Sequence, residues 1–263
     1  MARSAHDLLY VDFDGQRTDP ETLMDEGFVD ARHLQRVPDL AALVDDPRAD
    51  PVDRLTACLM LAEWGEPSGY RAVGAVARAP RRPAWFGCRI SEFHGVDSTF
   101  GELARRVVVS MISADDKGTQ LERVACLREL VGIADRECFD DQLGFGVVYG
   151  PPEDLLDDVV AAVHRGLPRL DDETALEFDL ASQLVDIAAP LTRVDEEKAI
   201  SLISDVLART TLALPVRYAF EVVAAGAKPI SWEFGRYLLS LGDGRDQDRF
   251  EWAIGLRRRR MGQ

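Results

Sequence analysis

The sequence predicts an all-α protein, an α-solenoid of antiparallel helix pairs, and three observations support this. Apolar residues recur every three or four positions almost everywhere after residue 50. Helix-starting and helix-ending residues flank these apolar runs, whereas strand-like alternation of apolar and polar residues is scarce. The 263 residues, 46% of them hydrophobic, can bury a large core as one elongated domain or two small ones.

Six stretches carry the helical period. In each of them the apolar side chains fall on one face of a helix, which we expect to pack against neighbouring helices. The stretches run over Val52–Leu59, Phe100–Met111, Leu156–Leu167 (Leu156, Val160, Val163 and Leu167), Leu176–Ile187, Ile200–Leu207 and Phe234–Leu241.

Residues typical of helix ends flank the stretches. Asp50 precedes Pro51 as an N-cap precedes a proline in the first turn, and Thr18 to Glu21 offer a capping box around Pro20. The pairs Thr99/Glu102 and Thr174/Glu177 have capping-box spacing too. Glycine or proline is expected to end helices at Gly65, Gly166, Pro190, Gly226 and Gly242.

Weak internal similarity favours degenerate repeats, since residues 57–61 echo residues 125–130. Residues 50–67 resemble a HEAT-like repeat, with small residues and leucines on a first helix and a Gly65-x-Pro67 turn into a second. The resemblance implies a repeat domain over 50–263, with 1–49 as an N-terminal extension or cap. HEAT-like proteins mostly serve as scaffolds that bind proteins, although some relatives are DNA glycosylases or lyase subunits. Fold alone does not choose between these functions.

Two segments depart from the helical pattern, Ala79 to Val96 and Arg136 to Pro152. The second is rich in glycine and aromatic residues around Gly144-Phe145-Gly146. Long irregular insertions in compact folds often carry function, and the alternative is an ordered connector that packs its aromatics on the helices.

Charge is distributed unevenly along this chain of net charge −15. Residues 151–210 hold 14 acidic and 5 basic side chains, a net charge of −9, which should repel nucleic acid and acidic membranes. We expect an acidic face near successive helix starts to bind a basic protein, although carboxylates there also complement the helix dipole. The predicted partner-binding residues are Asp154, Asp157, Asp158, Asp171, Asp172 and Glu173.

Basic residues gather in two places, between Arg71 and Arg89 and in the tail Arg257–Arg260. The first stretch gives an alternative function, a HEAT-like nucleic-acid-processing enzyme of the glycosylase type. Arginines would contact phosphates and an aromatic ring would stack on a base, unless the stretch is a structural loop that pairs with neighbouring acids. The residues of this alternative site are Arg81, Arg82, Trp85 and Arg89.

One further enzyme signal lies in the strand-like run Leu8 to Gly15, which ends in Asp12 and Asp14. It resembles the first motif of haloacid-dehalogenase-like phosphatases, and residues 242–246 resemble the acidic magnesium-binding motif of that family. Gln16 departs from the motif, and no βα units lie between the two segments. A solvated turn is the alternative interpretation.

Other chemistry has little support in the sequence. His94 could join Cys88, Glu92 and Asp97 in a metal site, but their spacing matches no known ligand pattern. Walker, Gly-x-Ser-x-Gly and Gly-x-Gly-x-x-Gly motifs are missing. We therefore predict no catalytic residue, no metal and no cofactor.

The expected location is the cytoplasm. The four cysteines are far apart and form neither a disulfide framework nor a zinc pattern, and the chain shows no secretion signal and no membrane span. Cys58 and Cys126 are expected to be buried thiols. The leading prediction is a non-enzymatic protein-binding module, of the kind found in immunity proteins or antitoxins that occlude a basic toxin.

Overall fold

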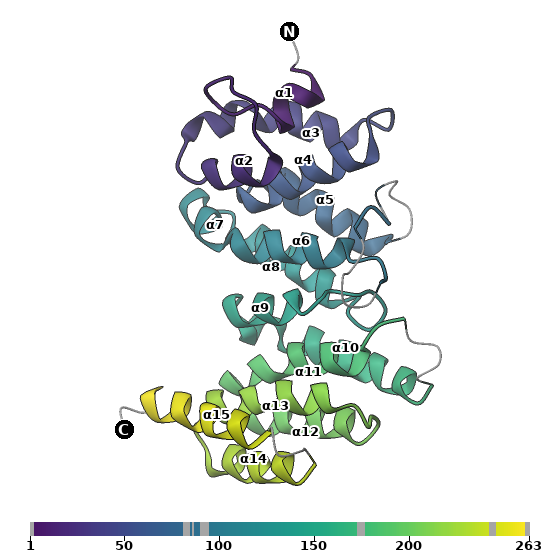
Figure 1. Ribbon diagram of the computed structural model, residues 1–263, viewed down its shortest axis with the longest axis vertical. Coiled ribbons are helices and arrows are strands. Elements are labelled where there is room, and N and C mark those ends of the chain that lie inside the picture. The colour runs from purple at the N-terminus through teal and green to yellow at the C-terminus, as the bar shows by residue number, and fades with distance from the viewer. Residues whose placement is uncertain are drawn as a thin grey trace. The chain divides into compact units, whose positions relative to one another are not determined.

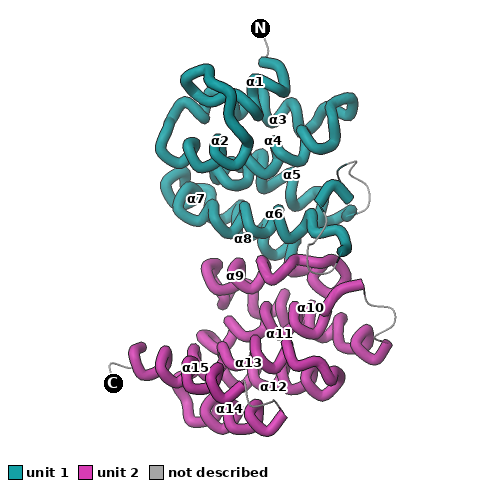
Figure 2. The backbone as a smooth tube through the Cα atoms, viewed as in Figure 1, with its two compact units in different colours: residues 1–130 teal, residues 131–263 magenta. Residues whose placement is uncertain are grey.

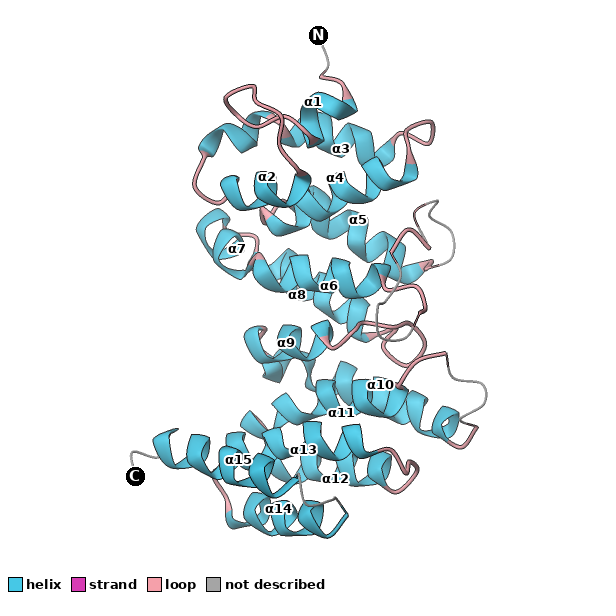
Figure 3. Ribbon diagram, viewed as in Figure 1, coloured by secondary structure: helices cyan, strands magenta, loops and turns pink. Residues whose placement is uncertain are grey.

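The computed structural model describes residues 3–80, 85, 87–89, 95–172, 177–241 and 246–260. Helices dominate these residues, and the β-pairing among them is a single isolated bridge between Val11 and Arg17 (Figure 3). The predicted all-α class is therefore confirmed. The solenoid of antiparallel pairs and its HEAT-like character stay predictions. In the part of the chain described, no helix combines the length and apolarity needed to cross a bilayer.

The chain divides into two compact units, residues 1–130 and 131–263 (Figure 2). In the first unit α4 is central and packs against α3, α5 and α6 (Figure 1). The predicted boundary between 49 and 50 stays a prediction, and helices on both sides of it belong to this unit. The helices are α1 (Ala5–Leu9), α2 (Pro20–Glu26), η1 (Ala31–Gln35), α3 (Val37–Asp45), α4 (Pro51–Glu63), α5 (Pro67–Arg78), α6 (Thr99–Val109), α7 (Met111–Lys117) and α8 (Gln120–Val131).

Helix α4 begins as predicted. The Asp50 carboxylate accepts the N–H groups of Val52 and Asp53, and Pro51 occupies the first turn. Gly65 follows the helix at φ +74°, a left-handed conformation that favours glycine. Cys58 on this helix and Cys126 on α8 are buried, as the apolar pattern predicted.

Two of the predicted capping boxes form differently. Asp19 is the N-cap of α2, and Glu21 turns instead to the guanidinium groups of Arg105 and Arg106. Helix α6 starts at Thr99 itself, whose N–H group is accepted by Asp97. The pair Thr174/Glu177 cannot be compared, because Thr174 lies outside the described residues. Glu21 forms ion pairs and Asp97 stabilises a local turn, and the spacing of residues along the sequence does not reveal these contacts.

A buried ion pair joins α4 to α6. Arg106 donates to Glu63 at 2.5 Å, and both side chains are almost completely buried. Burial raises the pKa of Glu63, and the Arg106 charge opposes that rise. Each residue of the pair keeps the other ionised, because an isolated buried charge is very costly.

The second unit is built around α11, which packs against α9, α10, α12, α13 and η3. Its buried residues include Leu180, Leu184 and Ile187, as the apolar period predicted. The helices are α9 (Gln142–Tyr149), α10 (Pro152–Leu170), α11 (Leu180–Ala188), η3 (Ala189–Arg193), α12 (Glu196–Leu207), α13 (Ala213–Ala225), α14 (Pro229–Leu241) and α15 (Asp246–Arg260).

Helix α10 corrects two predictions. Its buried face begins at Leu155 and Val159, not at Leu156 and Val160. The helix also continues past Gly166 to Leu170. Gly166 is there for close packing, since a Cβ at this position would lie 2.6 Å from a methyl carbon of Leu184 on α11.

The segment 136–152 departs from a third prediction, because its residues Gln142–Tyr149 form the helix α9. Its two glycines lower the intrinsic helix propensity, which is why the sequence pattern looked irregular. Leu143 and Val147 are nevertheless buried in the unit. Tertiary packing therefore decides the conformation here.

The predicted basic tail has a structural role. Arg257 donates to the carbonyl oxygens of Ala227 and Lys228, at 2.9 and 3.0 Å. Arg260 reaches the carbonyls of Ala224 and Ala225 at the end of α13. Guanidinium groups thus satisfy carbonyls at a helix C-terminus, where positive charge is favourable.

Candidate pocket in the second unit

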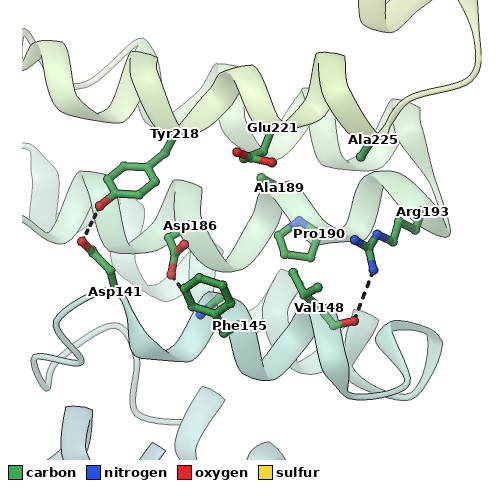
Figure 4. Close-up of a pocket in the computed structure, with 11 residues that line it drawn as sticks. Asp141, Phe145, Val148, Asp186, Ala189, Pro190, Arg193, Tyr218, Glu221 and Ala225 are labelled. Atoms are coloured by element: carbon green, nitrogen blue, oxygen red, sulfur yellow. Dashed lines mark hydrogen bonds between the residues drawn. The ribbon is translucent and has the colours of Figure 1, made fainter. Parts of the chain in front are cut away.

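A pocket of about 430 Å³ opens in the second unit, between α9, α11, η3 and α13 (Figure 4). Its walls are mostly apolar, with Val148 and Pro190 among them. Pockets of this size hold small ligands or single side chains. The residues that give it chemical character are Asp141, Phe145, Asp186, Arg193, Tyr218 and Glu221.

Gln183, buried on α11, anchors the turn that leads to the pocket. Its Oε1 accepts the N–H group of Phe139 at 2.8 Å, and its Nε2 donates to the carbonyls of Ala134 and Glu137. Asp140 and Asp141 follow with φ values of 45° and 62°. Non-glycine residues seldom adopt this left-handed conformation, and aspartate is among those that adopt it most readily. The anchored turn therefore places Asp141 at the pocket.

Asp186 enters the pocket from α11. Its Oδ2 accepts the N–H group of Gly144 at 2.9 Å, and a Cβ on Gly144 would lie 2.3 Å from the carboxylate oxygens. Because Gly144 has no side chain, the Asp186 carboxyl group can contact the backbone of α9 directly. Burial, with a further contribution from the Asp141 charge, raises the pKa of Asp186 to about 8.

Tyr218 and Asp141 link two sides of the pocket. The Tyr218 hydroxyl on α13 donates to Asp141 Oδ2 just before α9, as Figure 4 shows. Burial and the hydrogen bond to Asp141 raise the pKa of Tyr218, so the phenol remains protonated at neutral pH. This bond holds the Asp141 carboxylate close to Asp186.

Glu221 and Arg193 lie on α13 and η3. Arg193 donates to the Val148 carbonyl at 3.3 Å. Burial raises the pKa of Glu221, while Arg249 and Arg193 lower it. Within the residues that the structure describes, Glu221 makes no hydrogen bond and no ion pair. Three carboxyl groups therefore face one guanidinium group in this pocket.

An aromatic pair borders the pocket on α9. Phe145 is 55% exposed and stacks on Tyr149, with 6.4 Å between ring centroids. Exposed aromatic rings next to carboxylates favour cationic ligands, because the ring face attracts positive charge. In the described ranges, no group of three or more His, Cys, Asp or Glu side chains is arranged to hold a metal ion.

The structure separates the predicted acidic face into two groups. Asp154, Asp157 and Asp158 lie in the first two turns of α10, as expected for the start of a helix. Asp171 and Asp172 lie instead at its C-terminal end, about 25 Å away at the rise of an α-helix. Asp171 pairs there with Arg209 at 3.6 Å, and Glu173 lies outside the described residues.

The alternative nucleic-acid site can be described only in part. Arg81 and Arg82 lie outside the described residues, whereas Arg89 is exposed. Trp85 is 3% exposed, and the Arg54 guanidinium lies over its ring at 5.3 Å. The ring is therefore enclosed by protein in this structure and offers no face for stacking on a base.

The phosphatase resemblance loses its structural context. Leu8 and Leu9 lie in α1, so the start of the strand-like run is helical and not a strand. Asp12 accepts the N–H groups of Asp14 and Gln16 in a local turn, which is the alternative that the sequence offered. Residues 242–245 of the second motif lie outside the described part of the chain.

Two of the four candidate metal ligands, Glu92 and His94, lie outside the described residues. Asp97 accepts the N–H groups of Gly87 and Thr99, so it serves a local turn. Its role there is structural.

Sequence reasoning missed Asp186, Tyr218 and Glu221. Asp186 carried a signal, since it is the one charged residue in the apolar stretch Leu184–Ala188. A charged group on a buried helix face usually has a reason to be there. Tyr218 and Glu221 carried none, because their approach to α9 depends on packing between helices.

No protein-family model matches this chain, and neither a curated protein nor a solved structure matches it.

Proposed function

We propose that this protein is a non-enzymatic binding module for a protein partner with a basic surface. The observation that carries the proposal is the pocket of the second unit, where the carboxyl groups of Asp141, Asp186 and Glu221 lie among apolar walls. A net charge of −15 supports it, because an acidic protein attracts a basic partner over a long range and accelerates their association.

The form of this function that we propose is an immunity-type or antitoxin-like inhibitor, which occludes a basic toxin such as a nuclease. It would act in the cytoplasm, where the four free cysteines would stay reduced. A HEAT-like repeat architecture suits such a role, since rigid helical stacks present extended binding surfaces. The two acidic groups on α10 would add electrostatic steering, and the pocket would add specificity.

The test is affinity capture from the native lysate with elution in a salt gradient, followed by mass spectrometry. We expect one basic protein, which then binds the purified chain in calorimetry with an affinity that falls as salt rises. A variant with Asp154, Asp157 and Asp158 changed to lysine should associate at least tenfold more slowly while circular dichroism shows unchanged helicity. Co-purification of nucleic acid that nuclease treatment removes would contradict the proposal and favour the glycosylase-like alternative.

A further inference from the structure

Two carboxyl groups in the pocket have acceptor oxygens that receive no hydrogen bond from the part of the chain that the structure describes. Asp186 uses Oδ2 for the Gly144 N–H group, and its Oδ1 accepts no hydrogen bond from the described residues. Glu221 accepts none there at all. Asp186 is half-buried, whereas Glu221 is exposed to solvent. Half-buried polar groups are usually hydrogen-bonded in folded proteins, so Asp186 Oδ1 leaves a place for an N–H donor from outside the chain, and the exposed Glu221 carboxylate is accessible to the same donor.

The donor should be positively charged. With Asp141 and Glu221 ionised and Arg193 opposite them, the pocket carries a net charge of −1 while Asp186 is protonated and of −2 once Asp186 ionises. Arg193 is held by the Val148 carbonyl and lies apart from the Tyr218–Asp141 bond in Figure 4. The Asp141 and Asp186 side of the pocket thus remains acidic, while Arg249 and Arg193 offset the charge near Glu221.

Guanidinium suits this arrangement better than ammonium. It presents five N–H donors in a planar fork, which can reach separate carboxylates at once, and it stacks on aromatic rings. Phe145 offers an exposed ring next to Asp186 in Figure 4. Val148 and Pro190 offer apolar contact for an alkyl stem.

We infer that the pocket binds one arginine side chain of the basic partner. The guanidinium group lies between Asp141, Asp186 and Glu221, and the stem packs against Phe145. This inference rests on the proposed function, and it names the residue type by which the partner is recognised. An arginine anchored in a desolvated pocket is a typical hot spot of a protein interface.

Binding of the arginine is coupled to a proton. The ionisable groups that act on Asp186 are Asp141 before α9 and Glu221 on α13, Tyr218 on α13 is coupled to it, and Arg193 on η3 lines the same pocket. In the empty pocket Asp186 is protonated at pH 7, because burial raises its pKa to about 8. A bound guanidinium favours the ionised carboxylate, so binding releases a proton and tightens as pH rises towards 8.

The first experiment uses small probes on the full chain. N-acetyl-arginine N-methylamide, its lysine analogue and its uncharged citrulline analogue are titrated by NMR and calorimetry. We expect the arginine probe to shift the amide signals of Gly144 and its neighbours and to bind at least tenfold more tightly than either analogue. Its affinity should rise about tenfold between pH 6.5 and 8, with proton release measured in buffers of different ionisation enthalpy.

Variants locate the binding. Asp186→Asn and Phe145→Ala should each weaken the arginine probe about tenfold or more, because they remove a charge-assisted hydrogen bond and the stacking face. Asp205→Asn is the matched control, since it removes the same charge from an exposed position on α12 and should leave binding unchanged. Circular dichroism verifies that each variant is folded.

Three results would overturn the inference. They are equal affinity for the arginine and citrulline probes, tighter binding of the lysine probe than of the arginine probe, and an Asp186→Asn variant that binds the arginine probe as the parent does.

A failure of the proposed function would give other results than a failure of the inference. If the captured basic protein still binds Asp186→Asn and Phe145→Ala fully, the partner uses another surface and only the inference is wrong. If the arginine probe binds but no basic protein is captured, the pocket chemistry stands and the proposed function is wrong.

Discussion

Replacing Asp186 with asparagine should stabilise the protein, and the gain should grow with pH. Asparagine has nearly the same shape and keeps an oxygen that can accept the Gly144 N–H group. It removes only the ionisation of a carboxyl group that burial disfavours. The pKa of Asp186 rises from its ordinary value of 3.8 to about 8 in the folded state. At about 1.4 kcal/mol for each pKa unit, ionising the group in the folded state costs on the order of 5 kcal/mol.

The sign follows from proton binding. Between pH 4 and 8 the folded state holds a proton on Asp186 that the unfolded state has already lost. The contribution of Asp186 to stability is therefore greatest below pH 4 and is lost as pH rises to about 8. The difference in free energy of unfolding between Asp186→Asn and the parent should be small at pH 4, should grow through pH 7 and should level off above pH 8.

Urea unfolding of both proteins at pH 4.5, 7 and 8.5 measures this difference, with circular dichroism as the probe. Amide exchange in α11 assigns the change to the second unit. The chemical shift of the Gly144 amide titrates with Asp186 directly, because that N–H group donates to its carboxylate. The same measurement on Asp205→Asn provides the control. A difference that does not change with pH, or a Gly144 titration midpoint near 4, would refute the reasoning.

Three further predictions concern packing and polar contacts. Gly144→Ala should lower the free energy of unfolding by about 1–3 kcal/mol, because the added Cβ would meet the Asp186 carboxylate. The control is Gly74→Ala on α5, where the nearest contact of the added Cβ is at 3.6 Å, and thermal melts should show it to be neutral or stabilising. Arg106→Met should cost about 3–5 kcal/mol in urea unfolding because Glu63 is left buried without its partner, and a double variant with Glu63→Leu should recover most of the loss. An equal loss in the double variant would show that the charge is not the cause. Tyr218→Phe should cost about 1 kcal/mol through its lost hydrogen bond, and an unchanged melting temperature would contradict that role.

The helical class and several helix ends follow from the amino-acid sequence alone. The apolar period follows from the geometry of the α-helix, and Asp50, Pro51 and Gly65 act through their own backbone and side-chain chemistry. Cys58 and Cys126 were predicted as buried for the same local reason. The net charge and its concentration in residues 151–210 also follow directly from composition.

The conformation of α9, the end of α10 and the pocket depend on tertiary packing. Helix α9 forms because Leu143 and Val147 are buried, although its glycines disfavour a helix. Gly166 does not end α10, because it is needed for close packing against Leu184, which leaves no room for a side chain. The helix continues to Leu170, and Asp171 therefore lies at its C-terminal end. The pocket joins residues between 141 and 225, and the pKa of Asp186 depends on burial by several helices at once. Desolvation and close packing depend on all the residues that surround a group in space, and the spacing of residues along the chain does not reveal which residues those are.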